Sequence, residues 1–334
     1  MGKEGAGPES RSCKKPGPGE FTMPRTRRHK SQQSTFYHLY NRVAGDPNDY
    51  PFTDPVAAQQ FLSLCETYLD LYFCCLAAFE LMGNHYHLVV FVEQFRALSW
   101  RELKQRARLR FGPLWRWRTR HWNRSRWEQF NRDLFDVSCF MQHVNGEFSK
   151  WFNRRFHRRG PFWADRFKNS ELLDLEAVQT AILYVELNAV RAGLVQRPEE
   201  YRMGSAYWRW SGQQSARLIP LKALFPAARG EDSFTRYRAM LYHRGAVAPQ
   251  EHQAAIPDRI LHEEQARGFA RPGALRQRLR CWTDGVAMGG RESVGRLLEA
   301  YRRERRYTRR RNPIPQLGPL FSLREQRSHA FSPG

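Results

Sequence analysis

The sequence predicts an α+β fold: a ferredoxin-like split βαβ sheet with helices on one face, an additional helix, and a basic, mostly helical C-terminal extension. Two observations favour this class. Between residues 35 and 193, strand and helix patterns follow the order β-α-β-β-α-β-α, and the first six have the order of the split βαβ arrangement. Apolar residues make up 41% of the chain, which is enough for a buried core.

The first predicted strand, residues 35–43 (TFYHLYNRV), is rich in aromatic and β-branched residues. Asp54 and Pro55 then have the types of an N-cap and a first helical residue, so we expect a helix from there to about residue 69. Two apolar runs follow at 71–81 and 85–93. The short link Met-Gly-Asn between them suits a tight hairpin.

The remaining elements complete the pattern. A second helix is expected over about 138–156, with a glycine just past its end, and residues 160–172 (GPFWADRFKNSEL) have the composition of a fourth strand. A third helix is expected over 174–193, capped by Asp174 and ended by Gly193.

Charge points to the class of partner. The chain carries 55 Lys and Arg against 33 Asp and Glu, a formal net charge of +22, which favours nucleic acid or an anionic membrane surface as partner. No run is apolar and long enough to span a membrane, and the first residues lack the apolar run of a secretory signal. The six cysteines show no CxxC spacing, which is typical of reduced thiols. We therefore expect a cytoplasmic, nucleoid-associated protein.

Composition divides the chain into three predicted regions. Residues 1–34 are rich in Gly and Pro and predict a flexible basic tail. The range 35–215 holds the predicted elements, and 216–334 forms a basic extension. Seven arginines lie between Arg302 and Arg311, a run that would bind phosphates without regard to base sequence.

A basic insertion, about 95–137, separates the third predicted strand from the second helix. Residues 101–127 contain ten Lys or Arg and a single acid, Glu102, with tryptophans interleaved. Arginines bind phosphates and tryptophans stack on bases, so this composition is typical of a platform for single-stranded nucleic acid. The expected contact residues are Trp115, Arg116, Trp117 and Arg118. The alternative is a helical pair whose tryptophans pack on the sheet while its arginines are solvated.

Two features could carry chemistry. Side chains alternate along a strand, so His85 and His87 share a face, and two neutral imidazoles there can chelate a divalent cation. On the third helix, Tyr184, Asn188 and Arg191 lie on one face, away from the apolar stripe. The alternatives are histidines that are merely packed or exposed, and a surface tyrosine among ordinary polar neighbours.

Three ordered blocks, FELMGNHYHLVV, GPFWADRFKNSEL and YVELNAVRAGLV, resemble the REP-associated tyrosine transposases of the single-tyrosine HUH superfamily. The first resembles the metal-binding HUH motif, the second the Gly-x-x-Trp-x-x-Arg-Phe-Lys strand, and the third the helix of the nucleophilic tyrosine. The resemblance covers about residues 35–210. The chain departs from it where Ala189 follows Asn188, because many members have proline there.

The resemblance implies a single-stranded DNA transposase or endonuclease. His85 and His87 would bind Mg²⁺ or Mn²⁺, and Asn188 would complete the metal shell or orient the tyrosine. Tyr184 would attack a phosphodiester at a hairpin-forming repeat, leaving a 5′-phosphotyrosine link and a free 3′-hydroxyl. A cation would stabilise the developing phosphate charge, and the covalent link would conserve the bond energy for rejoining.

Phosphate contacts are expected from Arg191 and from Arg166 and Lys168, which would share one face of the fourth strand; a salt bridge is the alternative for the last two. Other functions stay open. The chain could be a domesticated protein that binds hairpin DNA or RNA without cleaving it, an RNA-binding ferredoxin-like domain, or a metal hydrolase without a covalent step. A homodimer is also open, since some HUH transposases complete each site with the partner's tyrosine helix.

Overall fold

The computed structural model describes residues 31, 33–46, 49–212, 218–227, 230–248, 253–266, 285–303, 314–315 and 320–324. All of them belong to one compact unit, Ser31–Gly334. The expected basic tail lies almost entirely outside the described residues, as does the arginine run after Arg303. None of the described helices is long and apolar enough to cross a membrane.

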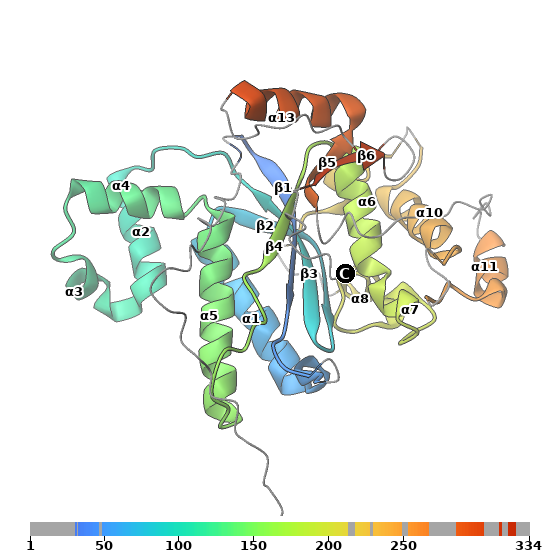
Figure 1. The fold of residues 1–334 in the computed structure, drawn as a ribbon, viewed down its shortest axis with the longest axis horizontal. Coiled ribbons are helices and arrows are strands. Elements are labelled where there is room, and N and C mark those ends of the chain that lie inside the picture. Colours follow the sequence, from blue (N-terminus) through green and yellow to red (C-terminus); the bar gives the residue numbers. More distant parts are fainter. Residues whose placement is uncertain are drawn as a thin grey trace, which may run out of the picture. The chain divides into compact units, whose positions relative to one another are not determined.

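Seven strands of the described residues form one sheet in the order β2-β3-β1-β4-β5-β7-β6 (Figure 1). They are β1 (Thr35–Arg42), β2 (Cys74–Met82), β3 (His85–Val92), β4 (Lys168–Leu172), β5 (Gly285–Gly290), β6 (Ile314–Pro315) and β7 (Leu320–Arg324). β1 pairs antiparallel with both β3 and β4, and β2 pairs antiparallel with β3. This is the strand order of a split βαβ sheet, so the predicted α+β class is confirmed.

The described helices connect and cover these strands. They are α1 (Pro55–Leu71), α2 (Trp100–Phe111), α3 (Trp115–Thr119), α4 (Arg124–Asp133), α5 (Val137–Arg155), α6 (Leu175–Glu186), α7 (Asn188–Arg191), α8 (Ser205–Ser211), α9 (Leu221–Leu224), α10 (Ser233–Gly245), α11 (Asp258–Gln265) and α13 (Arg291–Arg303). Short 3₁₀ turns are η1 (Pro51–Thr53), η2 (Gly112–Leu114) and η3 (Pro198–Glu200).

Local signals explain most element starts. The Asp54 carboxylate accepts a hydrogen bond from the backbone N–H of Val56, so the predicted cap of α1 is present. The fourth strand, however, is shorter than the predicted 160–172 and begins only at Lys168. Upstream of it the chain bends, and Trp163 makes an isolated bridge to Val43. Its indole Nε1 donates to the backbone carbonyl of Asn145, which ties this bend to α5.

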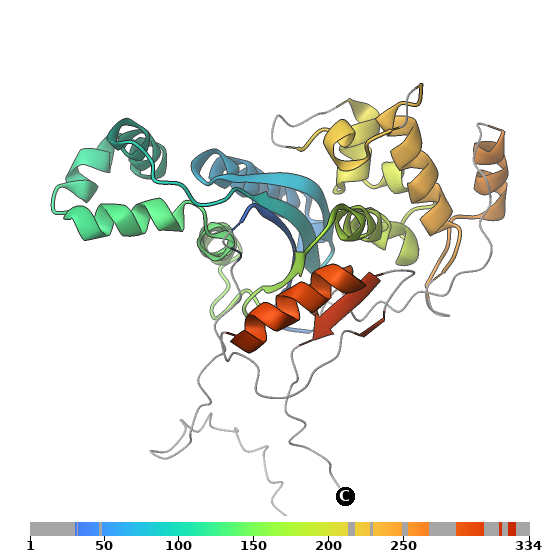
Figure 2. The same ribbon diagram turned by 90° about the horizontal axis from the view of Figure 1, so that it is seen from above.

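The sheet is covered on both faces (Figure 2). Helices α1 and α5 pack on one face, where Phe61, Tyr86 and Phe148 belong to a fully buried apolar cluster. Helix α6 packs on the other face, and its Ile182 joins a second buried cluster that includes Val89 of β3. The prediction of helices on one face therefore holds for α1 and α5, whereas the additional helix covers the opposite face.

The basic insertion folds as the helices α2, α3 and α4. It is anchored to the end of α1 by Arg106, whose Nη1 donates to the carbonyl of Leu71 at 2.9 Å. The Phe73 and Phe135 rings stack at 4.3 Å where the insertion returns to the sheet. The insertion is thus a helical projection attached to the α1 side of the sheet (Figure 1).

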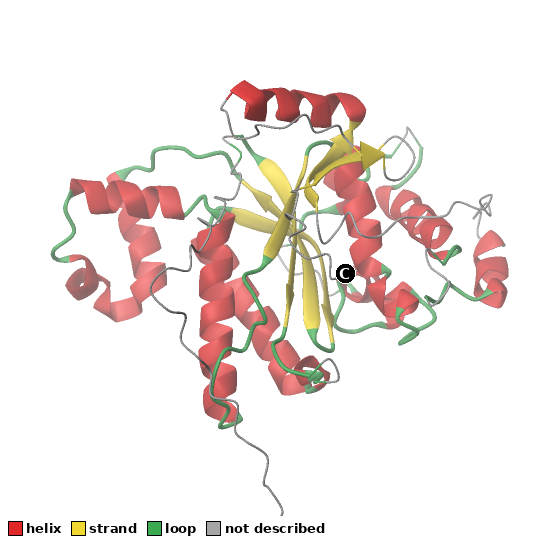
Figure 3. Cartoon of the chain, viewed as in Figure 1, coloured by secondary structure: helices red, strands yellow, loops and turns green. Residues whose placement is uncertain are grey.

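The described part of the C-terminal extension contains the helices α9, α10, α11 and α13, as expected of a mostly helical segment, and it also supplies β5, β6 and β7 (Figure 3). β5 pairs in parallel with β4, and β7 pairs antiparallel with β5. The backbone N–H of Gly290 donates to the Asp174 carboxylate at 2.6 Å, and the same carboxylate caps α6 through Ala177. The sequence patterns did not predict β5, because GVAMGG is short and glycine-rich and its partner strand is distant in the sequence.

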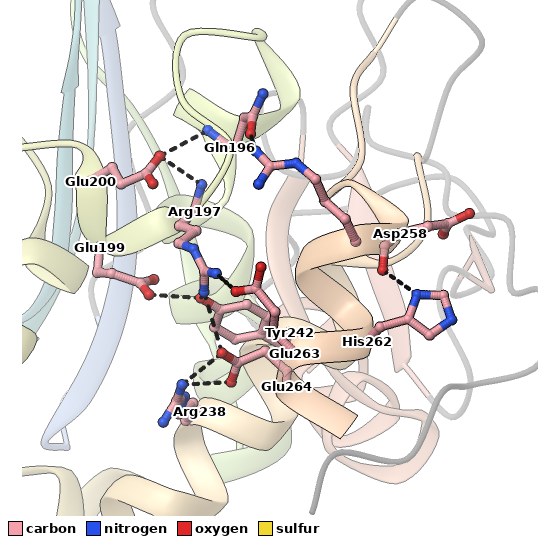
Figure 4. Close-up of polar contacts among 11 residues, drawn as sticks. Gln196, Arg197, Glu199, Glu200, Arg238, Tyr242, Asp258, His262, Glu263 and Glu264 are labelled. Atoms are coloured by element: carbon pink, nitrogen blue, oxygen red, sulfur yellow. Dashed lines mark hydrogen bonds and ion pairs between the residues drawn. The ribbon is translucent and has the colours of Figure 1, made fainter. Parts of the chain in front are cut away.

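An ion-pair network fastens α10 and α11 of the extension to the segment after α7 (Figure 4). Glu264, which is buried, receives hydrogen bonds from Arg197 at 3.3 Å and Arg238 at 2.7 Å. The Tyr242 hydroxyl donates to Glu199 at 2.7 Å. These contacts join three segments that are far apart in the sequence.

A second buried network holds the C-terminal end of α6. The Glu186 carboxylate accepts hydrogen bonds from Ser205 at 2.6 Å and Tyr237 at 2.5 Å, and it pairs with Arg209 at 3.2 Å. Both side chains of the ion pair are almost fully buried. A buried charge pair is costly to break because the remaining ion is left without a partner.

We therefore expect Arg209→Met to lower the free energy of unfolding by about 3–5 kcal/mol, because it leaves the Glu186 charge buried. The measurement is chemical denaturation followed by circular dichroism. Arg236→Met, which removes an arginine exposed at 40%, is the matched control and should change stability by less than about 0.5 kcal/mol. Equal effects of the two substitutions would contradict this role for the Glu186 network.

Candidate active site

The antiparallel ladder between β1 and β3 builds the site from the sheet side. His85 and His87 lie on the face covered by α6, as the strand alternation predicted, with ring centroids 5.3 Å apart. Tyr40 lies opposite His87 in the ladder, and their ring centroids are 5.0 Å apart. His38, two residues earlier on β1, makes a hydrogen bond between its Nε2 and Nδ1 of His87 at 3.0 Å.

Burial keeps the two histidines neutral. It lowers the pKa of His85 to about 4, with a smaller contribution from the nearby charge of Arg42. It also holds the pKa of His87 well below the usual range, and the neighbouring histidines add to this effect. Metal binding requires neutral imidazole, because the proton of an imidazolium occupies the ring nitrogen that would bind the metal. At neutral pH these two rings therefore do not have to lose a proton before a metal binds.

Tyr184 reaches the histidines from α6. Its ring meets the ring of His87 edge-on at 5.6 Å and that of His38 at 6.0 Å. The Arg191 guanidinium lies 5.2 Å from the centre of the tyrosine ring and donates to the Tyr184 carbonyl at 3.3 Å. Burial lowers the pKa of Arg191 to about 10, so the guanidinium is still charged at neutral pH. Three residues expected at the site, His87, Tyr184 and Arg191, are thus brought together.

The predicted continuous helix through Asn188 is wrong, because α6 ends at Glu186 and α7 begins at Asn188. In an unbroken helix the N–H of Ala189 would bond to the carbonyl of Val185. Instead this N–H donates to the Glu80 carboxylate at 2.5 Å, and the Asn188 Nδ2 donates to the Val185 carbonyl at 3.2 Å. This hydrogen bond uses the amide nitrogen of Asn188 and leaves its Oδ1 for a ligand.

Sequence reasoning missed four residues of this region: His38, Tyr40, Arg42 and Glu80. The first three alternate along β1, and this pattern could have indicated a polar face. Glu80 lies opposite His87 in the β2–β3 ladder and is fully buried. Burial raises the pKa of Glu80 well above its usual range, whereas the Ala189 hydrogen bond and the charge of Arg191 act in the other direction.

The two basic residues expected on the fourth strand do not share it. Lys168 is the first residue of β4 and lies opposite Tyr40, so it is on the same face of the sheet as the histidines. Arg166 lies before the strand in a bend and is exposed. Its backbone N–H donates to the side chain of Asp165, a local turn contact that competes with strand pairing.

The structure separates the residues expected to bind nucleic acid in the insertion. Trp117 is 54% exposed, and Arg116 and Arg118 are exposed beside it. Trp115 is half-buried and packs against the apolar cluster under α1 and α5. Each of the two interpretations therefore describes part of the insertion: Trp115 packs, whereas Arg116, Trp117 and Arg118 lie on the surface.

The donor set for a divalent cation consists of imidazole nitrogens. Nδ1 of His85 is hydrogen-bonded to the side chain of Asn84 and Nδ1 of His87 to His38, which leaves Nε2 of both rings as candidate ligands. Among the described residues, no three His, Cys, Asp or Glu side chains are grouped to hold a metal. The pair therefore fits as two protein ligands, with the remaining positions supplied by other groups such as substrate oxygens and water.

No protein-family model matches the sequence, and no curated protein matches it. Among solved structures, the chain is similar to one described as a REP-associated tyrosine transposase bound to a REP hairpin. The identity is 10%, the match covers 63% of this chain and 98% of that chain, and the TM-score is 0.40. A similarity of this size carries no conclusion about function, which depends on the geometry of the site.

Glu80 provides a test of the helix break. Glu80→Leu removes the acceptor of the buried Ala189 N–H, so we expect it to lower the free energy of unfolding by about 1–3 kcal/mol. Glu80→Gln keeps an acceptor oxygen and should retain most of the stability. Denaturant unfolding of the two variants measures the difference. If both variants lose the same stability, the hydrogen bond to Ala189 is not what holds α7 in place.

Proposed function

We propose that this chain is a metal-dependent, single-stranded DNA endonuclease or transposase that acts through a tyrosine nucleophile at hairpin-forming repeats. One observation carries the proposal: a tyrosine, a pair of neutral histidines and a buried arginine from separate elements lie together on one face of the sheet. The three sequence blocks that resemble REP-associated tyrosine transposases support the same reading. A DNA substrate of this kind is consistent with a nucleoid-associated protein in the cytoplasm.

In the proposed reaction, the phenol oxygen of Tyr184 forms a bond to phosphorus while the bond to the 3′ oxygen breaks. The phenol loses its proton and the 3′ oxygen gains one, which leaves a 5′-phosphotyrosine link and a 3′-hydroxyl. Reversal with another 3′-hydroxyl would rejoin the strand without an external energy source. A divalent cation held by His85 and His87, with Asn188 Oδ1 as a further ligand, would stabilise the charge that develops on the phosphate.

The other residues of the site orient the reacting groups in this proposal. Arg191 holds the Tyr184 backbone and ring, and its remaining donors are suited to a phosphate oxygen. Lys168 and Arg42, on the same face of β4 and β1, would bind flanking phosphates. His85, His87 and Tyr184 belong to one chain, so this arrangement needs no residue from a second copy.

The burial of the site favours a second candidate, a protein that binds hairpins without cleaving them. His87 is 3% exposed and Tyr184 is 9% exposed, values that are also typical of packed side chains. The two candidates share the basic surface and differ in the covalent step. A covalent protein–DNA adduct therefore distinguishes them.

The first experiment incubates the protein and Mn²⁺ with labelled single-stranded oligonucleotides that form hairpins, and scores nicking and adducts on denaturing gels. We expect Tyr184→Phe to reduce adduct formation by at least about 10³-fold, because the nucleophile is lost. Tyr40→Phe is the matched control, because Tyr40 is a second tyrosine that packs against His87 but is not the proposed nucleophile. The Tyr40→Phe variant should still form the adduct. An adduct that persists in Tyr184→Phe would refute the nucleophile assignment.

Removal of the metal tests the histidine pair. We expect EDTA to abolish the adduct, and His85→Ala or His87→Ala to weaken Mn²⁺ binding, measured by calorimetry, by about 10–100-fold. His121→Ala, an exposed histidine of the insertion, should leave Mn²⁺ binding unchanged. Wild-type Mn²⁺ affinity in both site variants would mean that the ion, if required, binds elsewhere.

A further inference from the structure

Two tryptophans of the insertion are about half exposed, Trp100 at 52% and Trp117 at 54%. The Trp100 ring lies 4.6 Å from the ring of the buried Trp127, whereas Trp117 lies outside that aromatic cluster. Trp117 lies on α3, and the neighbouring Leu114 is 58% exposed. The guanidinium groups of Arg118 and Arg120 lie 5.2 Å and 4.9 Å from the centre of the Trp117 indole. An exposed indole beside guanidinium groups presents the two groups that bind single-stranded nucleic acid, an aromatic surface for base stacking and cations for phosphates.

Other tryptophans of the α2–α4 segment, in contrast, pack against aromatic rings of the same segment. Trp127 is buried, and its ring centroid lies 4.8 Å from that of Trp122. Trp122 in turn contacts the ring of the buried Phe130 at 5.2 Å. Trp122 and Trp127 therefore fit the alternative interpretation of the insertion, in which the tryptophans pack and do not bind nucleic acid. Trp117 does not belong to this cluster.

The charges beside Trp117 are not neutralised by the described part of the chain. The two acids nearest in sequence are engaged elsewhere: Glu102 pairs with Arg96 at 2.9 Å, and Glu128 pairs with Arg124 at 3.0 Å. Within the described residues, none of Arg116, Arg118 and Arg120 lies within ion-pair distance of a carboxylate. This surface therefore complements a polyanion.

The surface lies far from the candidate active site. His85 is the first residue of β3, whereas the chain enters the insertion after Val92, its last. A strand advances about 3.3 Å per residue, so β3 alone separates its two ends by about 23 Å. Figures 1 and 2 also show α2–α4 on the opposite side of the sheet from α6 and α7. A nucleic acid bound there would be several nucleotides from the scissile phosphate.

We propose that Arg116, Trp117, Arg118 and Arg120, here called the α3 platform, form a second binding surface for single-stranded DNA. The proposal rests on the proposed function for its choice of DNA. The indole stacks on one base, and the three arginines bind the flanking phosphates. A single strand fits better than a duplex, because its bases are free to stack on an aromatic ring whereas paired bases are already stacked on each other.

The test measures equilibrium binding of fluorescein-labelled dT20 and of a 20-base-pair duplex by anisotropy, in EDTA so that no cleavage occurs. We expect Trp117→Ala to weaken dT20 binding about tenfold and to change duplex binding less than twofold. Trp117→Tyr keeps a stacking ring and should restore most of the affinity. Equal losses for dT20 and duplex, or no loss for dT20, would overturn the stacking role.

The charges are tested by the salt dependence of dT20 binding. Loss of two phosphate contacts in Arg118→Gln/Arg120→Gln should reduce the slope of log K against log salt by about 1.4. Arg154→Gln/Arg155→Gln, which removes two exposed arginines from the end of α5, is the matched control and should change the slope much less. The same slope change in both double variants would mean that only net charge matters, and the platform would be refuted.

The two proposals fail in different ways. If hairpins form an adduct but Trp117→Ala binds dT20 as wild type does, the platform is refuted and the proposed function stands. If no oligonucleotide forms an adduct but dT20 binding depends on Trp117, the platform is confirmed and the tyrosine chemistry is refuted. Binding of the matching RNA at least tenfold more tightly than DNA would overturn the choice of DNA.

Discussion

In the antiparallel ladder between β1 and β3, Tyr40 lies opposite His87, and the candidate active site depends on this register. A slip of one residue would move both histidines to the face that packs against α1 and α5. The apolar side of the same strands prevents it, since Leu39, Tyr86 and Leu88 are buried in that cluster. The packing that stabilises the sheet therefore also positions the polar residues on its other face.

The second support of the site is a carboxylate rather than an apolar contact. Glu80 of β2 lies opposite His87 of β3 and accepts a hydrogen bond from the N–H of Ala189. This bond replaces a helical one and so interrupts the helix that carries Tyr184. The break turns Arg191 back toward the Tyr184 carbonyl and ring. Further along, Glu186 fastens the end of α6 to α8 and α10. Two buried acids thus hold the tyrosine helix in its position above the sheet.

The sequence predicted the structure best where a pattern among neighbouring residues determines it. Alternation along a strand predicted the shared face of His85 and His87, and the capping chemistry of Asp54 predicted the start of α1. It failed where a distant group decides. The end of α6 depends on Glu80, more than a hundred residues earlier, and β5 depends on pairing with β4 across a comparable gap. In both cases the two interacting segments are too far apart in the sequence for a local pattern to show that they meet.

The pairing of β5 with β4 also has a consequence for how the chain can be shortened. In the first six elements alone, β4 would be an edge strand, with a row of unpaired backbone groups next to the candidate active site. β5 covers the end of that edge at Glu171 and Leu172, and the Gly290 N–H donates to the carboxylate that caps α6. A fragment that stops before β5 would expose a template for β-augmentation by other chains, and so would aggregate more readily than the full chain.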